Sequence, residues 1–209
     1  MRSLILFIAT LVSVSTGVAY AQWQDTNLTV VKLAFEEAHI PQDIGLPFNP
    51  LVILGVTYFS SKTGLIPVKA GAELSMNDTY SAPTFNIIGN PGVGPLVIFL
   101  IDPDAPWPQD PSLAQARHFM GGSYYWDPES GVLTEIFLPL NPYDHPRPSK
   151  GSARHRYIFY VFKQSVELGL QKTITATSSR LNFNLSDFAR ETNLGDPIGG
   201  TFMWISPDP

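Results

Sequence analysis

The chain has 209 residues, in which 13 lysines and arginines stand against 18 aspartates and glutamates to give a net charge of −5. A composition of 44% hydrophobic and 15% charged residues is typical of a globular protein and argues against a disordered chain or a coiled coil. The lack of cysteine excludes disulfides, thiolate metal sites, iron–sulfur clusters and cysteine nucleophiles, and the acidic balance argues against a nucleic-acid partner.

The first residues have the pattern of a secretory signal peptide. A positively charged start, Met1–Ser3, leads into the uncharged apolar run Leu4–Val12, and Ala19–Tyr20–Ala21 supplies the small–x–small pattern that signal peptidase recognises. The apolar run is shorter than the roughly 20 residues that a membrane-spanning helix needs. We therefore expect a signal peptide over residues 1–21 and a secreted, extracellular protein.

Residues 22–209 are expected to form one domain, because a chain of this length buries a sizeable core without disulfides. We expect a monomer without a membrane span. Three sequons fit the secretory route and predict N-linked glycosylation at Asn27, Asn77 and Asn184.

The first predicted element is a short amphipathic helix. Leu28, Val31, Phe35 and Ala38 recur at helical spacing, and the helix is expected to end before Pro41. A second helix is predicted near the C-terminus over Asn184–Glu191, with Asn184 or Ser186 as its N-cap.

Between these helices, short apolar runs separated by proline, glycine and asparagine predict strands. The predicted strands are Leu51–Phe59, Leu65–Lys69, Thr84–Ile88, Pro95–Ile101, His118–Trp126, Val132–Leu138, Arg156–Gln164 and Ile174–Thr177. Because Pro95–Ile101 is apolar throughout, it is expected at the centre of a sheet that is covered on both faces. The pattern predicts a mainly β fold, a β-sandwich or antiparallel sheet core with a few peripheral helices.

The segment Asp102–Pro103–Asp104–Ala105–Pro106 directly follows that central strand. It places two carboxylates at a strand exit, and its prolines stiffen the backbone that carries them. Taken alone, the segment is also typical of a solvated turn.

Two histidines favour a polar site beside this segment. Strand alternation places His155 and Tyr157 on one face of a predicted strand, and His118 begins another strand. In the loop before His155, Gly151 and the neighbouring serines offer backbone N–H groups to an anion.

Together these segments resemble the phosphatidylethanolamine-binding protein family, which includes Raf-kinase-inhibitor, flowering-signal and carboxypeptidase-inhibitor members. The matching segments span most of the chain after the signal peptide: Ala38–Ile44, Asp102–Pro106, Arg117–Phe119, Gly151–Tyr157, Phe183–Phe188 and Leu194–Ile198. The combination of Asp102–Pro106 with the Gly151–Tyr157 segment is the specific part of the match.

The resemblance implies two antiparallel β-sheets with short helices, and one pocket that receives phosphate-like or carboxylate groups. Carried over by position, the ligand-binding residues are Asp102, Asp104, Pro106, His118, Gly151, His155 and Tyr157. The chain departs from the family pattern in two places: Arg147 and Ser149 occupy the loop before Gly151, and Gly121–Ser123 replaces an asparagine-containing stretch.

A neighbouring carboxylate stabilises the charged form of a histidine, so His118 and His155 are predicted to donate to a ligand oxygen, with Tyr157 as a neutral donor. At least one of the two histidines is expected to titrate above the usual value of about 6.5.

The predicted function is that of a secreted, non-catalytic binding protein for phosphate-like headgroups, as in phosphatidylethanolamine-type lipids, without a cofactor or a metal. One alternative is inhibition of a secreted or vacuolar peptidase, such as a carboxypeptidase, through a surface in which Trp107 is either an exposed anchor or a wall of the pocket. Another is a metal-assisted hydrolase built from two aspartates and two histidines.

Overall fold

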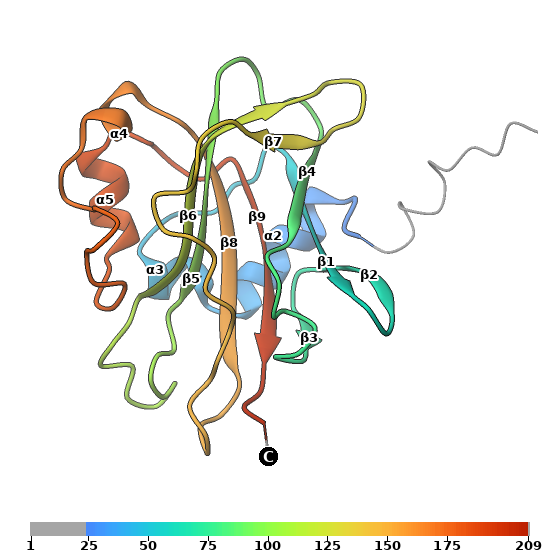
Figure 1. Cartoon of the computed structure of the whole chain (residues 1–209), viewed down its shortest axis with the longest axis vertical. Coiled ribbons are helices and arrows are strands. Elements are labelled where there is room, and N and C mark those ends of the chain that lie inside the picture. The colour runs from blue at the N-terminus through green and yellow to red at the C-terminus, as the bar shows by residue number, and fades with distance from the viewer. Residues whose placement is uncertain (1–23, 209) are drawn as a thin grey trace, which may run out of the picture.

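The computed structural model describes residues 24–208 as a mainly β fold of two sheets with a few short helices (Figure 1). This confirms the fold class predicted from the sequence. The predicted signal peptide lies outside the described residues.

The larger sheet has six strands in the order β3-β9-β8-β5-β6-β7. Their bounds are Ala72–Leu74 for β3, Leu96–Asp102 for β5, Ala116–Trp126 for β6, Leu133–Glu135 for β7, His155–Lys163 for β8 and Gly199–Ile205 for β9. Neighbouring strands are antiparallel except β3 and β9, which pair in parallel.

The smaller sheet is antiparallel, in the order β2-β1-β4, with β1 over Ile53–Ser60, β2 over Gly64–Pro67 and β4 over Thr84–Ile88. The four described helices are α2 (Leu28–Glu37), α3 (Ile40–Ile44), α4 (Val166–Leu170) and α5 (Leu185–Glu191).

Two asparagine side chains cap helices at their N-termini. Asn27 Oδ1 accepts hydrogen bonds from the backbone N–H groups of Thr29 (2.9 Å) and Val30 (3.3 Å) at the start of α2. Asn184 Oδ1 accepts from the N–H of Asp187 (3.0 Å) at the start of α5. Of the two caps predicted for α5, the structure therefore has Asn184 rather than Ser186.

The strand β5 is buried along its whole length, as its apolar sequence predicts. On one face of its sheet, side chains such as Phe99 pack against the helices, including Phe35 of α2 and Phe188 of α5. On the other face, side chains such as Leu100 pack against the smaller sheet. Hydrophobic cores on both faces of the sheet therefore hold the C-terminal end of β5 in place.

The predicted strand Ile174–Thr177 is wrong, because this segment is a loop. Its threonines satisfy the pattern for a strand, but the Thr175 N–H donates to Ser178 Oγ (2.9 Å) and the Ser178 N–H donates to the Thr175 carbonyl (3.2 Å). These local bonds close a turn instead of a ladder. The strands β3 and β9 and the helices α3 and α4 were not predicted.

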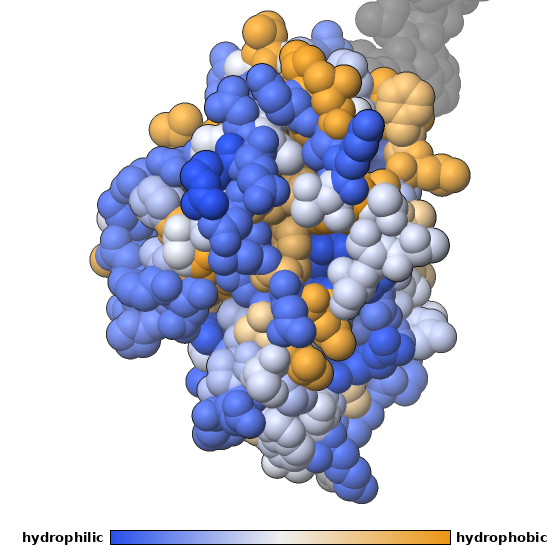
Figure 2. Space-filling model, turned by 90° about the vertical axis from the view of Figure 1, so that its left-hand side faces the viewer, coloured by the Kyte–Doolittle hydropathy of each residue, from blue (hydrophilic) through white to orange (hydrophobic). Residues whose placement is uncertain are grey.

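Two loops that carry the candidate site lie at the same end of the molecule. Figure 1 shows residues 103–115 and 145–153 together at the bottom, beside the C-terminal end of β9. The side that carries α4 and α5 is mostly hydrophilic, with hydrophobic residues toward its upper end and a smaller group near its middle (Figure 2). Within residues 24–208, no helix combines the length and apolar character needed to cross a membrane.

Candidate functional site: a cavity rich in arginine

A cavity of about 190 Å³ opens between the end of β5, the starts of β6 and β8, and the loops beside them. Its walls are formed by Asp102, Ala105, Pro106, Leu113, Ala116, Arg117, His118, Asp144, Arg147, Ser149, His155, Tyr157, Arg180 and Leu181. We call it the anion cavity.

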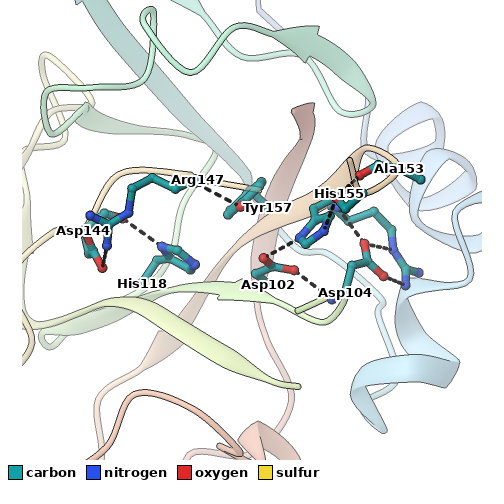
Figure 3. Close-up of polar contacts among 10 residues, drawn as sticks. Asp102, Asp104, His118, Asp144, Arg147, Ala153, His155 and Tyr157 are labelled. Atoms are coloured by element: carbon teal, nitrogen blue, oxygen red, sulfur yellow. Dashed lines mark hydrogen bonds and ion pairs between the residues drawn. The ribbon is translucent and has the colours of Figure 1, made fainter. Parts of the chain in front are cut away.

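At one wall, Asp102 and His155 form a buried pair (Figure 3). Asp102 Oδ2 lies 2.9 Å from Nδ1 of His155, and Asp102 Oδ1 accepts from the N–H of Asp104 at 2.7 Å. The second ring nitrogen of His155, Nε2, lies 3.0 Å from Ser152 Oγ, whose hydroxyl donates to the Ala153 carbonyl. Both nitrogens of His155 are therefore engaged by protein groups, and this histidine positions Asp102 and the 152–153 loop.

Asp104 points away from the cavity, toward Arg156. Its two oxygens accept from the Arg156 side chain at 3.0 and 2.6 Å, and Oδ2 also accepts from the Arg156 backbone N–H at 2.7 Å. The guanidinium of Arg156 reaches on to Asp43 of α3 (2.6 Å) and the carbonyl of Ala38 (2.7 Å). The second carboxylate of the motif thus ties the β5 exit to the helices.

His118 lies on the opposite wall from His155 (Figure 3). Its Nδ1 donates to the backbone carbonyl of Asp144 at 2.9 Å, which leaves Nε2 without a described partner. Burial lowers the pKa of His118, against the opposing effect of Asp102. The expectation of a raised pKa is therefore wrong for this histidine, because desolvation outweighs the carboxylates.

Tyr157 lies between the two histidines, with its ring 5.1 Å from that of His118 and 6.3 Å from that of His155. Its hydroxyl accepts from the backbone N–H of Arg147 at 3.2 Å. Burial, with the charge of Asp102 as a second cause, raises the pKa of this phenol. Tyr157 is therefore neutral and keeps a hydroxyl proton to donate.

Three arginines surround the cavity, and only one of them is paired with a carboxylate within residues 24–208. Arg147 donates to Asp144 at 2.9 Å. Arg180 donates to the carbonyls of His118 (3.2 Å) and Pro142 (2.9 Å).

Arg117 is the more unusual of the two arginines that lack a carboxylate, because its side chain is only 1% exposed. Its guanidinium donates to Asn141 Oδ1 and the Ser179 carbonyl and lies 4.6 Å from the centre of the Phe183 ring. Burial, followed by the charge of Arg180, lowers the pKa of Arg117 to about 10. A buried cation with only neutral partners favours an anion in the space beside it.

Of the residues predicted for the site, the structure brings five together around this cavity: Asp102, Pro106, His118, His155 and Tyr157. Asp104 and Gly151 are not among its walls. Arg147 and Ser149, the departures from the family pattern, do line it.

The sequence reasoning missed Arg117, Asp144 and Arg180 as lining residues. Arg117 directly precedes His118 in the sequence. Because adjacent side chains of a strand point to opposite faces, strand alternation did not predict both residues at one cavity. Arg180 follows the segment Ile174–Thr177, which was wrongly predicted as a strand, so no local signal connects it to β6.

Trp107 is 38% exposed and does not line the cavity. A Cβ on Gly151 would lie 3.9 Å from its ring, so the tryptophan sits against the 149–152 loop on the outside. Among residues 24–208, no group of three or more histidine, aspartate or glutamate side chains is arranged to hold a metal ion.

The sequence matches the family profile described as phosphatidylethanolamine-binding protein over residues 60–203. The curated relatives include CEN-like protein 4 of Nicotiana tabacum, which is 33% identical over 156 residues, covering 75% of this chain and 82% of the relative.

Among solved structures, a carboxypeptidase Y inhibitor complexed with its cognate proteinase is similar with a TM-score of 0.70 and 21% identity, covering 87% of this chain and 97% of the inhibitor. A phosphatidylethanolamine-binding protein from Plasmodium vivax is similar with a TM-score of 0.64 and 18% identity, covering 85% of this chain and 98% of the other. At these identities the two structures support the fold.

Proposed function

The chain belongs to the phosphatidylethanolamine-binding protein family, and from this premise we propose that it is a secreted, non-catalytic binding protein. The anion cavity takes a small anion of the phosphate class, as in the headgroups of phosphatidylethanolamine-type lipids. The observation that carries this proposal is the buried Arg117, which faces the cavity without a carboxylate partner among the described residues.

The charges around the cavity favour an anionic ligand. Arg117, Arg147 and Arg180 supply three cations, against the carboxylates of Asp102 and Asp144. A guanidinium presents a planar fork of donors that matches phosphate and carboxylate oxygens. The hydroxyl of Tyr157 adds a neutral donor.

The arrangement supports binding rather than catalysis. His155, the side chain that would serve as a general base, has both ring nitrogens within hydrogen-bond distance of Asp102 and Ser152. Asp102, His155 and Ser152 thus have the order of a Ser–His–Asp triad. The Ser152 hydroxyl, however, donates its proton to the Ala153 carbonyl at 2.6 Å and not to His155 Nε2, so the histidine does not activate this hydroxyl here.

Calorimetric titration of the purified protein with glycerophosphoethanolamine and with inorganic phosphate tests the proposal. We expect Arg117→Gln to weaken the binding of both probes at least tenfold, because it removes a charge-assisted contact in a desolvated site. Arg180→Gln is expected to weaken binding in the same direction.

The matched control is Arg190→Gln, since Arg190 pairs with Asp187 on the surface of α5 and does not line the anion cavity. Thermal unfolding of each variant separates loss of binding from loss of fold, and the more exposed Arg180 provides a second variant if Arg117→Gln does not fold. Unchanged affinity in both cavity variants would overturn the proposal.

Inhibition of a peptidase, the alternative expected from the sequence, has one observation in its favour. Trp107 is half-exposed on the outside of the 149–152 loop, where an aromatic side chain is a suitable interface anchor. The fold is also that of a carboxypeptidase Y inhibitor, which supports the alternative at the level of the fold. We keep it as a second hypothesis.

A further inference from the structure

A second cavity, of about 170 Å³, lies between the two sheets where β4 meets β6 and β7. Its walls include the aromatic rings of Phe85, Phe119, Tyr124 and Tyr143 and the carboxyl group of Glu135. We call it the aromatic cavity. It shares no lining residue with the anion cavity, although Phe119 and Tyr143 are the chain neighbours of His118 and Asp144.

Glu135 brings a carboxylate to a position where the strand pattern calls for an apolar residue. Along β7, Leu133 is buried, Thr134 is exposed and Glu135 turns inward again. Its Oε1 atom is buried and has no hydrogen-bond partner among residues 24–208. Burial raises the pKa of this carboxyl group, and a side-chain hydrogen bond with Tyr124 opposes that shift. No lysine, arginine or histidine of the described chain forms an ion pair with Glu135 either.

The backbone beneath this carboxylate has room for it only because residue 121 is glycine. A Cβ on Gly121 would lie 2.8 Å from Glu135 Oε1 and 2.5 Å from the tip of the Phe119 ring. Contacts this short do not occur, so a side chain at position 121 would displace the carboxylate. Gly121 therefore makes room for an inward carboxylate that costs free energy when it has no partner.

The aromatic rings around Glu135 are held in fixed positions. The ring centre of Phe85 lies 6.0 Å from that of Phe119 and 5.7 Å from that of Tyr124, at interplanar angles of 27° and 82°. The hydroxyl of Tyr143 donates to the Thr79 carbonyl at 2.5 Å, which anchors its ring. The faces of such rings attract cations, most strongly where water is excluded.

These features together match one class of ligand, and we propose that the aromatic cavity binds an organic ammonium group against Glu135 Oε1 and the surrounding rings. The cavity, of about 170 Å³, has room for a small organic cation such as a quaternary ammonium, which with its methyl groups has five non-hydrogen atoms. Ala82 at the rim is exposed, so the cavity is open to solvent.

Other occupants fit less well. An anion would meet the carboxylate of Glu135. A divalent metal ion requires several oxygen or nitrogen ligands, whereas here one carboxylate stands among aromatic rings. A neutral apolar group would leave Oε1 desolvated and without a partner.

Titration of the purified protein with choline and ethanolamine tests this proposal, with 3,3-dimethylbutan-1-ol and propan-1-ol as uncharged counterparts of similar shape. We expect at least one of the two cations to bind saturably and at least tenfold more tightly than its counterpart. Glu135→Gln keeps the shape of the side chain and is expected to weaken cation binding at least tenfold. Phe85→Leu is expected to weaken the binding of the cation more than the binding of the alcohol, because it removes the face of an aromatic ring and retains an apolar wall.

The matched control is Glu129→Gln, which removes an exposed carboxylate from the turn between β6 and β7 and is expected to leave binding unchanged. Phosphate binding in Glu135→Gln is also expected to be unchanged, since the two cavities share no residue. Three results would each overturn the proposal: no saturable binding of either cation, equal affinities for cation and alcohol, or full cation affinity in Glu135→Gln.

Discussion

His118 lies where its own protonation and the binding of an anion affect each other. In the free protein, burial lowers its pKa, and Nδ1 already donates to the Asp144 carbonyl. At neutral pH its free Nε2 is therefore unprotonated and offers a lone pair to the cavity. An anion beside it favours the imidazolium, so the bound protein is expected to hold one more proton than the free protein.

This coupling predicts how anion affinity depends on pH. Sulfate is a suitable probe because its charge stays constant over the range in question. Its affinity is expected to rise as the pH falls from about 8 to about 5, by up to about tenfold per pH unit where one proton is taken up. The rise levels off below the lowered pKa of free His118.

The control for this prediction is His118→Gln, which keeps a polar side chain but does not titrate. Calorimetry at several pH values is expected to show a much flatter dependence for this variant. An equally steep dependence in the variant would assign the proton to another group of the cavity and contradict the role of His118.

At the residue scale, the sequence predicted which segments meet at the cavity. It predicted the roles of the individual residues less well. Asp102, His155 and Tyr157 meet at the cavity because strand alternation and the strand exit dictate it. The pairing of Asp104 with Arg156 depends on how α3 docks, and local patterns hold no information about that contact. The same is true of Arg117 and Arg180, which lie 63 positions apart in the printed sequence and meet only in the folded chain.

Among the elements, β9 has the strongest structural role that the sequence did not indicate. It is flanked by β8 and β3, and its first two residues are Gly199 and Gly200. Glycine has a low propensity for strands, so these two glycines at the start of β9 masked the strand pattern in the sequence. The strand forms because of tertiary packing. A Cβ on Gly200 would lie 2.6 Å from the Phe159 carbonyl oxygen and 3.2 Å from the ring of Phe35.

Gly200→Ala is therefore expected to destabilise the protein by about 2 kcal/mol or more, because a backbone atom of β8 cannot move aside cheaply. Chemical denaturation measures this change. Gly169→Ala in α4 is the control, since no atom lies within 4 Å of its added methyl group and alanine favours a helix. A Gly200→Ala protein as stable as the original would show that β8 and β9 can separate locally without cost.

Across the whole molecule, Arg156 connects layers that are distant in the sequence. Its side chain is 12% exposed and joins Asp104 at the exit of β5, Asp43 of α3 and the carbonyl of Ala38 behind α2. The helix layer covers most of this side chain, so Arg156 is a buried link between layers and not part of a solvated surface.

Arg156→Gln is expected to lower the free energy of unfolding by about 3 kcal/mol or more, since it leaves the buried Asp104 without its charged partner. The comparison is Arg154→Gln, two residues away. Arg154 is half-exposed and 3.7 Å from Glu73, so its loss is expected to cost about 1 kcal/mol or less. Equal costs for the two variants, measured by denaturation, would contradict the role of Arg156 as the link between layers.

The two asparagine caps have a practical consequence for any sugar carried by this chain. A glycan is attached through Nδ2, whereas Asn27 and Asn184 cap their helices through Oδ1, so one amide can serve both purposes. Enzymatic removal of the glycan by an amidase leaves aspartate, which retains an oxygen for the cap. Asparagine-to-glutamine substitution instead moves that oxygen one methylene further from the helix. Deglycosylated protein and sequon-deleted protein are thus different molecules at these two helix starts, and a stability lost only in the latter belongs to the cap rather than to the sugar.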